Sequence, residues 1–288
     1  MPVVDFHTHI LPPEFIMRRA DLCARDRWFN LLYANPRARL ACAEDLVASM
    51  DQARVDASVV FGFAFADAGL CAACNAYVLE AAQQYPGRLL PFLTVNPLAG
   101  ETALRQAIDG LEAGAVGIGE LMPGGQGFAL TDFACLDPLL ELAREAGVPL
   151  MFHVNEPVGH TYPGKGDQGP QQAFQLAEHA PSNTLVFSHW GGGLPFYELM
   201  PEGSAVLANT YYDTAASLFL YDDAIFRHVA AWAASKILWA TDYPLIGQAR
   251  FLRRMQKLGL ESDLLDRLLG GNALTLLNRA KSQGMEKR

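Results

Sequence analysis

The sequence predicts an α/β protein built as a single (β/α)₈ TIM barrel with a long insertion after the first strand. Two observations indicate this fold class. Short apolar runs rich in β-branched and aromatic residues recur eight times, and each is followed by an amphipathic segment. The runs are mostly continuous rather than alternating with polar residues, as expected for a parallel sheet covered on both faces. A length of 288 residues suits one barrel.

The predicted strands all end in polar residues or in glycine and proline. In chain order they span residues 3–8, 57–63, 89–95, 116–121, 150–154, 185–188, 206–212 and 237–241. Helices are expected between them, and the one at 132–145 has recognisable ends, because Thr131 and Asp132 can cap its start and Gly147 can end it before Pro149. The predicted helices span residues 43–53, 71–84, 101–112, 132–145, 171–179, 222–234, 248–258 and 261–278.

The connection after the first strand, residues 11–42, is too long for a simple turn. On a barrel, such an insertion usually forms part of the active-site wall or a lid. The alternative is an excursion with no role in the site, or one that forms an oligomer contact. No linker rich in proline, serine or glycine divides the chain, so residues 1–288 are expected to form one domain.

Composition excludes several classes of function. The chain has 22 Lys and Arg against 31 Asp and Glu, and its net charge of -9 repels nucleic acid and anionic lipid surfaces. The longest apolar stretch, residues 59–66, is too short to span a membrane. The amino terminus lacks the cationic and apolar regions of a secretory signal, and five cysteines form an odd set. We therefore expect a cytoplasmic enzyme with reduced thiols.

Candidate metal ligands follow the predicted strands. His7 and His9 lie two residues apart on the first strand, so their side chains point to the same face and can chelate one ion. His153, His189 and Asp242 each come at the end of a later strand. Because the carboxyl ends of barrel strands face a common pocket, these five residues are expected to converge on one active site.

The same residues resemble the metal-site pattern of the amidohydrolase superfamily. The segments 5–13 (DFHTHILPP), 188–192 (SHWGG), 240–244 (ATDYP) and 269–273 (LGGNA) further resemble its amidohydrolase-related branch. That branch includes aminocarboxymuconate-semialdehyde decarboxylase, resorcylate-type decarboxylases and many hydrolases. The resemblance spans nearly the whole chain.

The resemblance implies one divalent metal ion, held by His7, His9, His153 and Asp242, with His189 free to act as acid or base. Zinc is the expected ion, since imidazole and carboxylate ligands suit it and an open position lets it lower the pKa of bound water to about 7. Manganese is the alternative. Asp242 would accept the proton of that water, as its counterpart does in hydrolytic members.

Glu120 ends the fourth strand, where some superfamily members supply a bridging carboxylate or modified lysine. If Glu120 bridges, His7, His9 and Asp242 would hold one ion, while His153 and His189 would hold a second. If it does not bridge, it would orient a histidine or contact the substrate. Both alternatives stay open.

Substrate contacts are expected from aromatic, polar and cationic residues around the same rim. Such a lining suits a small planar or carboxylated molecule, whose carboxylate would pair with Arg or Lys. A homo-oligomer is compatible with the sequence. The candidate substrate-binding residues are Arg39, Gln126, His160, Lys165, Trp190 and Tyr212.

Three functions are consistent with these residues. The leading hypothesis is metal-dependent hydrolysis of a small amide, ester or lactone by activated water. The alternative is nonoxidative decarboxylation of an aromatic or unsaturated carboxylic acid on a single metal, with His189 moving a proton. The third is a barrel that binds metal or ligand without catalysis, although a degenerate scaffold should have lost some of the five ligand positions.

Overall fold

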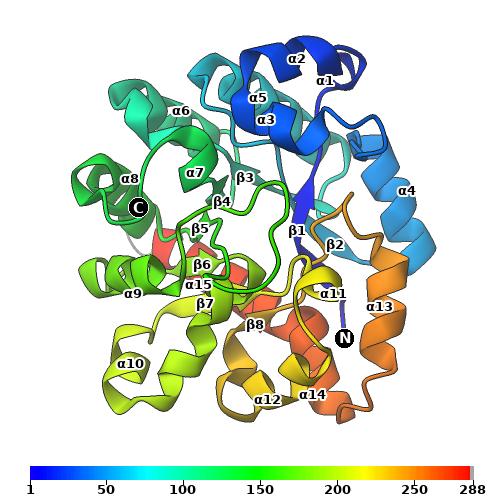
Figure 1. Ribbon diagram of the computed structural model, residues 1–288, viewed down its shortest axis with the longest axis vertical. Helices are drawn as coiled ribbons and strands as arrows, with labels where there is room; N and C mark the ends of the chain where they lie inside the picture. The colour runs from blue at the N-terminus through cyan, green and yellow to red at the C-terminus, as the bar shows by residue number, and fades with distance from the viewer. Residues whose placement is uncertain (286–288) are drawn as a thin grey trace.

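The computed structural model describes residues 1–285, with side chains described up to residue 279. Its centre is a parallel sheet in the order β1 to β8, ringed by helices (Figure 1). A strand overlaps each of the eight predicted segments, so the barrel-like α/β fold is confirmed. The strands are β1 (Val4–His9), β2 (Ala57–Phe61), β3 (Leu89–Leu93), β4 (Gly117–Leu121), β5 (Leu150–Phe152), β6 (Leu185–Phe187), β7 (Thr210–Asp213) and β8 (Ile237–Leu238).

The first strand and the segment after β8 meet through backbone hydrogen bonds. Phe6 N–H donates to Trp239 O at 2.9 Å, Asp242 N–H donates to His7 O at 3.0 Å, and His9 N–H donates to Tyr243 O at 2.8 Å. These bonds bring the two ends of the sheet together and nearly complete the barrel. They also place the end of β1 directly beside Asp242.

Helices cover the outside of the sheet, and the helix after β8 is followed by three further helical segments. The bounds are α4 (Ala43–Ala53), α5 (Ala68–Gln84), η1 (Pro97–Ala99), α6 (Glu101–Glu112), α7 (Pro123–Gln126), α8 (Phe133–Ala146), α9 (Pro170–His179), η2 (His189–Leu199), α10 (Pro201–Val206), α11 (Ser217–Leu220), α12 (Ala224–Ala233), η3 (Ala234–Lys236), α13 (Gln248–Gln256), α14 (Ser262–Asp266), η4 (Arg267–Gly271) and α15 (Asn272–Met285).

Apolar strand residues divide between the two faces of the sheet. One set, including Phe6, Phe92 and Met151, forms a cluster that the residues of α15 join. The other set packs against the surrounding helices. Val60 lies in a cluster with residues of α4 and α13, and Phe152 lies in a second cluster with residues of α6, α8 and α9. Burial on both faces explains why the strands are continuous apolar runs in the sequence.

The long insertion predicted after the first strand is not evident as a separate feature, so this part of the prediction is wrong. Residues 13–33 form three short helices, α1 (Pro13–Met17), α2 (Arg19–Arg25) and α3 (Arg27–Tyr33). Phe29 of α3 is fully buried and lies in one cluster with Phe63 and Phe65, which follow β2. Because this segment contributes apolar side chains to a shared cluster, it is part of the barrel wall.

The strand boundaries also differ from the prediction, most of all in β7 and β8. Val206 belongs to α10, so β7 begins only at Thr210. The ladder of β8 ends after Leu238, because Trp239 N–H donates to Leu268 O and the chain then turns toward β1. β8 therefore ends four residues before Asp242, but the hydrogen bond from Asp242 N–H to His7 O still holds Asp242 beside the end of β1.

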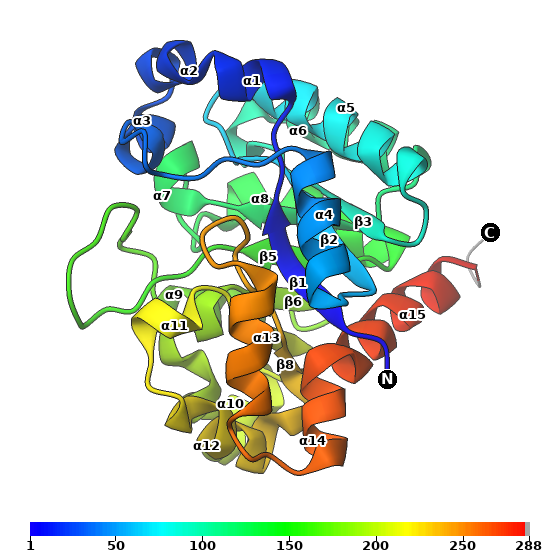
Figure 2. The ribbon, with the colours of Figure 1, turned by 90° about the vertical axis from the view of Figure 1, so that its right-hand side faces the viewer.

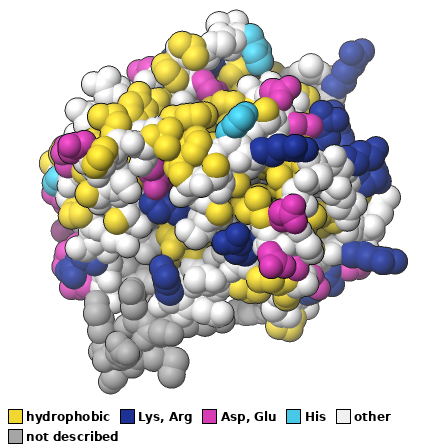
Figure 3. All heavy atoms as spheres, turned by 90° about the horizontal axis from the view of Figure 1, so that it is seen from below, with side chains coloured by type: hydrophobic (Ala, Val, Ile, Leu, Met, Phe, Trp, Pro, Cys, Tyr) yellow, Lys and Arg dark blue, Asp and Glu magenta, His cyan; other side chains and the backbone are white. Residues whose placement is uncertain are grey.

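Within the described part of the chain, no helix combines the length and apolar character needed to cross a membrane. Hydrophobic side chains nevertheless gather on the face seen in Figure 3. Four exposed large apolar residues belong to η2 and its end: Phe196, Tyr197, Leu199 and Met200. Self-association of the chain stays a prediction.

Candidate metal centre

The structure brings six predicted residues to the carboxyl ends of the strands. They fall into two neighbouring groups, and within each group the potential ligand atoms all lie within 4.8 Å of one another. The first group is His7, His9 and Asp242, and the second is Glu120, His153 and His189. His153 therefore groups with Glu120 and His189 rather than with the other three ligands that the family resemblance implied.

In the first group, three donor atoms converge on one point. Nε2 of His7 and Nε2 of His9 are 3.0 Å apart. Oδ1 of Asp242 lies 3.6 Å from the first of these nitrogens and 3.3 Å from the second. His7 is fully buried, while the His9 and Asp242 side chains keep 14% and 16% exposure, which leaves one open side for a ligand.

The Nδ1 atoms of His7 and His9 already make hydrogen bonds within the protein. Nδ1–H of His7 donates to Oδ2 of Asp213 at 2.8 Å, and Nδ1–H of His9 donates to the carbonyl of Gly62 at 3.1 Å. Since a carboxylate and a carbonyl can only accept, both Nδ1 atoms carry a proton. The two Nε2 lone pairs consequently face each other and Asp242, so a proton or a metal ion must lie between them.

Electrostatics favours a cation at this point. Burial alone would lower the pKa of His7, but the carboxylates of Glu120, Asp213 and Asp242 outweigh it and raise that pKa to about 10. Burial would raise the pKa of Asp242, but the hydrogen bond from His9 and the nearby histidine charges lower it to about 2. Imidazole and carboxylate donors suit zinc, and manganese is also compatible with nitrogen and oxygen ligands.

The second group is built around a buried carboxylate. Oε1 of Glu120 lies 3.1 Å from Nδ1 of His153 and 3.7 Å from Nε2 of His189, and these two ring nitrogens are 3.2 Å apart. Oε2 of Glu120 is 3.7 Å from Nε2 of His7, so the carboxylate lies between the groups. Burial opposes its ionisation, yet the charges of His7, His153 and His189 hold the pKa of Glu120 well below its usual range.

Unusual backbone conformations place several of these side chains. His189 and Asp242 adopt left-handed φ angles of 55° and 61°, which cost non-glycine residues about 1–3 kcal/mol. His189 N–H donates to Oδ1 of Asp213 at 2.9 Å, and Asp242 N–H donates to His7 O. Before Glu120, residue 119 must be glycine because its φ is 131° and an added Cβ would lie 2.5 Å from Met151 O.

Three of the predicted substrate-binding residues have their polar atoms engaged inside the protein. Gln126 is buried and its amide bonds the backbone of Phe65, Val95 and Met122. Trp190 is fully buried and donates to Ser217 Oγ at 2.7 Å. Tyr212 is buried as well and donates to Glu198.

The remaining three substrate-binding candidates lie on more open segments. His160 and Lys165 belong to the connection between β5 and α9, residues 153–169, where Lys165 Nζ donates to the carbonyls of Val158 and His160. Arg39 is exposed between α3 and α4. A contact between these side chains and a substrate stays a prediction.

Two residues that organise the centre were not predicted as ligands or catalytic residues. Asp213 is fully buried and accepts hydrogen bonds from the His7 ring and from the backbone of His189 and Ala215. The sequence feature that pointed to the candidate ligands also applies to Asp213, because Asp213 is the last residue of β7. Asn155 contacts Nε2 of His153 at 3.1 Å, a contact that strand patterns do not reveal.

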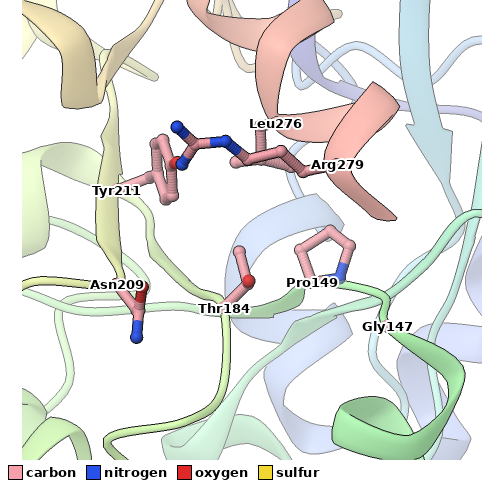
Figure 4. Close-up of a pocket in the computed structure, with 7 residues that line it drawn as sticks. All are labelled: Gly147, Pro149, Thr184, Asn209, Tyr211, Leu276 and Arg279. Carbon is pink, nitrogen blue, oxygen red and sulfur yellow. The ribbon is translucent and has the colours of Figure 1, made fainter. Parts of the chain in front are cut away.

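Two cavities differ in their relation to the centre. A small apolar one adjoins His9 and is lined also by Leu11, Tyr33, Leu40, Ala41, Phe63 and Pro244. The other, drawn in Figure 4, lies near the amino ends of β5, β6 and β7. The candidate metal ligands lie at the opposite, carboxyl ends of the strands. This second cavity is lined by Gly147, Pro149, Thr184, Asn209, Tyr211, Leu276 and Arg279, and contains no residue of the metal centre.

A sequence model of the family described as Amidohydrolase matches residues 4–279, nearly the whole chain and every candidate ligand. This chain belongs to the amidohydrolase family. No curated protein matches this amidohydrolase.

Solved structures of similar fold include several decarboxylases. The 5-carboxyvanillate decarboxylase of Sphingomonas paucimobilis is 17% identical, with a TM-score of 0.79 over 96% of this chain and 99% of that one. The Novosphingobium aromaticivorans enzyme, complexed with manganese and 4-hydroxy-3-methoxy-5-nitrobenzoic acid, is 18% identical, with a TM-score of 0.79 and 96% coverage of each chain. The 2,6-dihydroxybenzoate decarboxylase from Rhizobium is 17% identical, with a TM-score of 0.72 over 96% of this chain and 99% of that one. At these identities the likeness shows the fold of the amidohydrolase.

Proposed function

We propose that this member of the amidohydrolase family is a metal-dependent decarboxylase that removes carbon dioxide from a small aromatic or unsaturated carboxylic acid without net oxidation. The three similar structures described above are decarboxylases of aromatic acids, and one of these was solved with manganese and a nitrobenzoic acid. These comparisons support decarboxylation better than the hydrolysis that led the sequence hypotheses.

The proposal rests mainly on two adjacent groups of side chains, of which one can bind a cation and the other can transfer a proton. His7, His9 and Asp242 present three donor atoms that need a cation between them. Beside them, His153, Glu120 and His189 form a hydrogen-bonded set that can hold and move a proton. Decarboxylation requires both, because the carboxylate must be held and the carbon that loses it must gain a proton.

Different side chains would bind the cation and transfer the proton. A divalent ion, when bound by His7, His9 and Asp242, would supply positive charge for the oxygens of the acid. Nδ1–H of His189 donates to Ala215 O at 3.1 Å, so Nε2 is the atom of His189 that can take or give a proton. The bond between carbon and carboxylate breaks, its electron pair stays on carbon, that carbon takes the proton, and carbon dioxide leaves.

The small apolar cavity beside His9 has an aromatic wall. Tyr33 and Phe63 line it, and their ring centroids are 5.9 Å apart in an edge-to-face arrangement. Such a wall can cover one face of an aromatic or conjugated acid while the carboxylate points toward the metal ligands. Zinc and manganese both fit the donor set.

Hydrolysis of a small amide, ester or lactone is the second candidate, and the position of Glu120 favours it. One oxygen faces His7 and the other faces His153, as a carboxylate that bridges two ions would. Two ions would provide the activated water that hydrolysis needs.

The test is product analysis of the metal-loaded protein. Purified chain loaded with Zn²⁺ or Mn²⁺ would be incubated with hydroxybenzoates, conjugated unsaturated acids, esters, lactones and amides. We expect carbon dioxide from at least one acid and none from metal-free protein. Turnover of esters, lactones or amides with no carbon dioxide from any acid would overturn the proposal in favour of hydrolysis.

A further inference from the structure

The cavity at the amino ends of β5, β6 and β7 is built by the register of these strands and is lined mainly by polar atoms. Leu150 N–H donates to Thr184 O at 3.0 Å, and Leu185 N–H donates to Asn209 O at 3.1 Å. These bonds hold the residues that precede the three strands side by side. Pro149, Thr184 and Asn209 therefore form one wall of the cavity.

Helix α15 covers this end of the barrel and supplies another wall. In Figure 1 α15 (red) lies behind the strands, and in Figure 2 it begins near the amino terminus, on the side where β1 starts. Leu276 of α15 is 2% exposed and joins Val4 and Phe6 in the apolar cluster within the sheet. Because residues three apart share one face of a helix, the buried position of Leu276 places Arg279 over the cavity.

The cavity offers hydrogen-bond donors that have few partners. Figure 4 shows Arg279 reaching toward Tyr211, whose hydroxyl accepts a bond from Nη1 of Arg279 at 3.3 Å. This long bond is the only polar contact of the guanidinium within the described part of the chain. The Tyr211 O–H stays free to donate, and the Thr184 hydroxyl likewise has no partner among the described residues. Asn209 Nδ2 is occupied, since it donates to Pro181 O at 2.8 Å.

The charge and the size of the cavity suit a small anion. None of its seven lining residues is acidic, so Arg279 is a local positive charge in a chain with a net charge of -9. A guanidinium presents planar N–H donors that match the oxygens of a carboxylate or a phosphate. The cavity volume is about 60 Å³, and since one water needs about 10–15 Å³ there is room for about four to six non-hydrogen atoms. Acetate and inorganic phosphate are of this size.

We propose that this cavity is a binding site for a small oxyanion, a carboxylate or a phosphate, held by Arg279 and Tyr211 with the Thr184 hydroxyl as a third donor. The anion would accept N–H bonds from the guanidinium and O–H bonds from the two hydroxyls. Because Thr184 precedes β6 and Tyr211 belongs to β7, the bound anion would join α15 to the starts of both strands. The site lies at the end of the barrel opposite the metal ligands and is independent of the proposed decarboxylation.

The experiment measures anion binding by isothermal titration calorimetry. Sodium phosphate and sodium acetate would be titrated separately into zinc-loaded wild type, Arg279→Gln, Tyr211→Phe and Arg267→Gln, each checked for folding by circular dichroism. Arg267 is a matched control, because it is an exposed arginine at the start of η4 that does not line the cavity. Any anion that binds zinc at the metal centre does so in all four proteins. The difference between wild type and Arg279→Gln therefore measures the proposed site.

We expect Arg279→Gln to weaken anion binding by about 10–100-fold, because it removes hydrogen bonds from a charged donor. Tyr211→Phe should weaken it by about 2–10-fold, and Arg267→Gln should bind like wild type. Whichever anion binds wild type more tightly identifies the group that the site accepts.

Three results would overturn the inference: no binding of either anion by wild type, equal binding by wild type and folded Arg279→Gln, or an equal loss in Arg267→Gln. If Arg279→Gln does not fold, wild-type affinity in Tyr211→Phe would overturn it instead. None of these measurements involves turnover, so their outcome leaves the decarboxylase proposal to its own test.

Discussion

Replacing Asp213 with Asn should weaken metal binding even though Asp213 is not itself a donor to the ion. Oδ1 of Asp213 accepts two backbone N–H groups, those of His189 and Ala215, each at 2.9 Å. The amide oxygen of Asn must take that position to satisfy both. Its NH₂ group then points at Nδ1 of His7, where the carboxylate now accepts at 2.8 Å.

The expected loss of metal affinity follows from the replacement of this acceptor oxygen by an NH₂ group. His7 would have to move its ring proton from Nδ1 to Nε2, and Nε2 is the atom that faces His9 and Asp242. Loss of a carboxylate that orients a metal-binding histidine typically weakens metal affinity by about 10–100-fold, or about 1.4–2.7 kcal/mol. The fold should persist, because the substitution preserves shape and both backbone hydrogen bonds.

The assay is competition for Zn²⁺ with a chromogenic chelator, alongside circular dichroism to confirm folding. The matched control is Asp137→Asn, which alters a surface pair between Asp137 and His179, 2.6 Å apart and remote from the centre. That variant should bind zinc like wild type. A folded Asp213→Asn protein whose zinc affinity stays within twofold of wild type would refute the reasoning about the His7 proton.

Three further results are expected. His9→Ala should leave the first group with two donors and lower metal occupancy after dialysis; full occupancy by mass spectrometry would remove His9 from the ligand set. Asp242→Asn should keep the circular dichroism spectrum yet reduce turnover by at least about 100-fold, because a neutral amide is a poorer ligand and holds less negative charge near the ion; wild-type rates would contradict this. Because the pKa of His7 is raised from 6.5 to about 10 in the metal-free chain, zinc binding at pH 8 should release about one proton and tighten as pH rises toward 10. The same shift gives the metal-free chain stability that is complete below pH 6.5 and lost as pH rises through 10. Calorimetry in buffers of different ionisation enthalpy measures the proton, and zero release would show that His7 is already neutral.

The sequence was informative where function depends on strand ends. His7, His9, Glu120, His189 and Asp242 could be placed on one rim because every parallel strand delivers its last residues to the same side of the sheet. The branch resemblance rested on these positions, and the match to the amidohydrolase family over residues 4–279 confirms it. The positions of residues at the carboxyl ends of the strands were therefore enough to predict which side chains lie together at the candidate metal centre.

The sequence was less informative where side-chain direction depends on local backbone. Trp190 was expected at the rim, but its left-handed φ of 59° turns the indole toward Ser217 in the core. The grouping of His153 with Glu120 depends on a side-chain contact of 3.1 Å between Nδ1 and Oε1, which no residue pattern encodes. The connection 11–42 was predicted to be an insertion because of its length, although its apolar residues pack against residues that follow β2.

The contact between the two ends of the sheet has a consequence for biosynthesis. His7 and His9 leave the ribosome more than two hundred residues before Asp242, whose N–H bonds to His7 O. A growing chain consequently has no complete set of donors until its last strand has emerged. Metal capture is therefore a late event that joins the first strand to the last, and an ion bound there would oppose the separation of those strands in the finished protein.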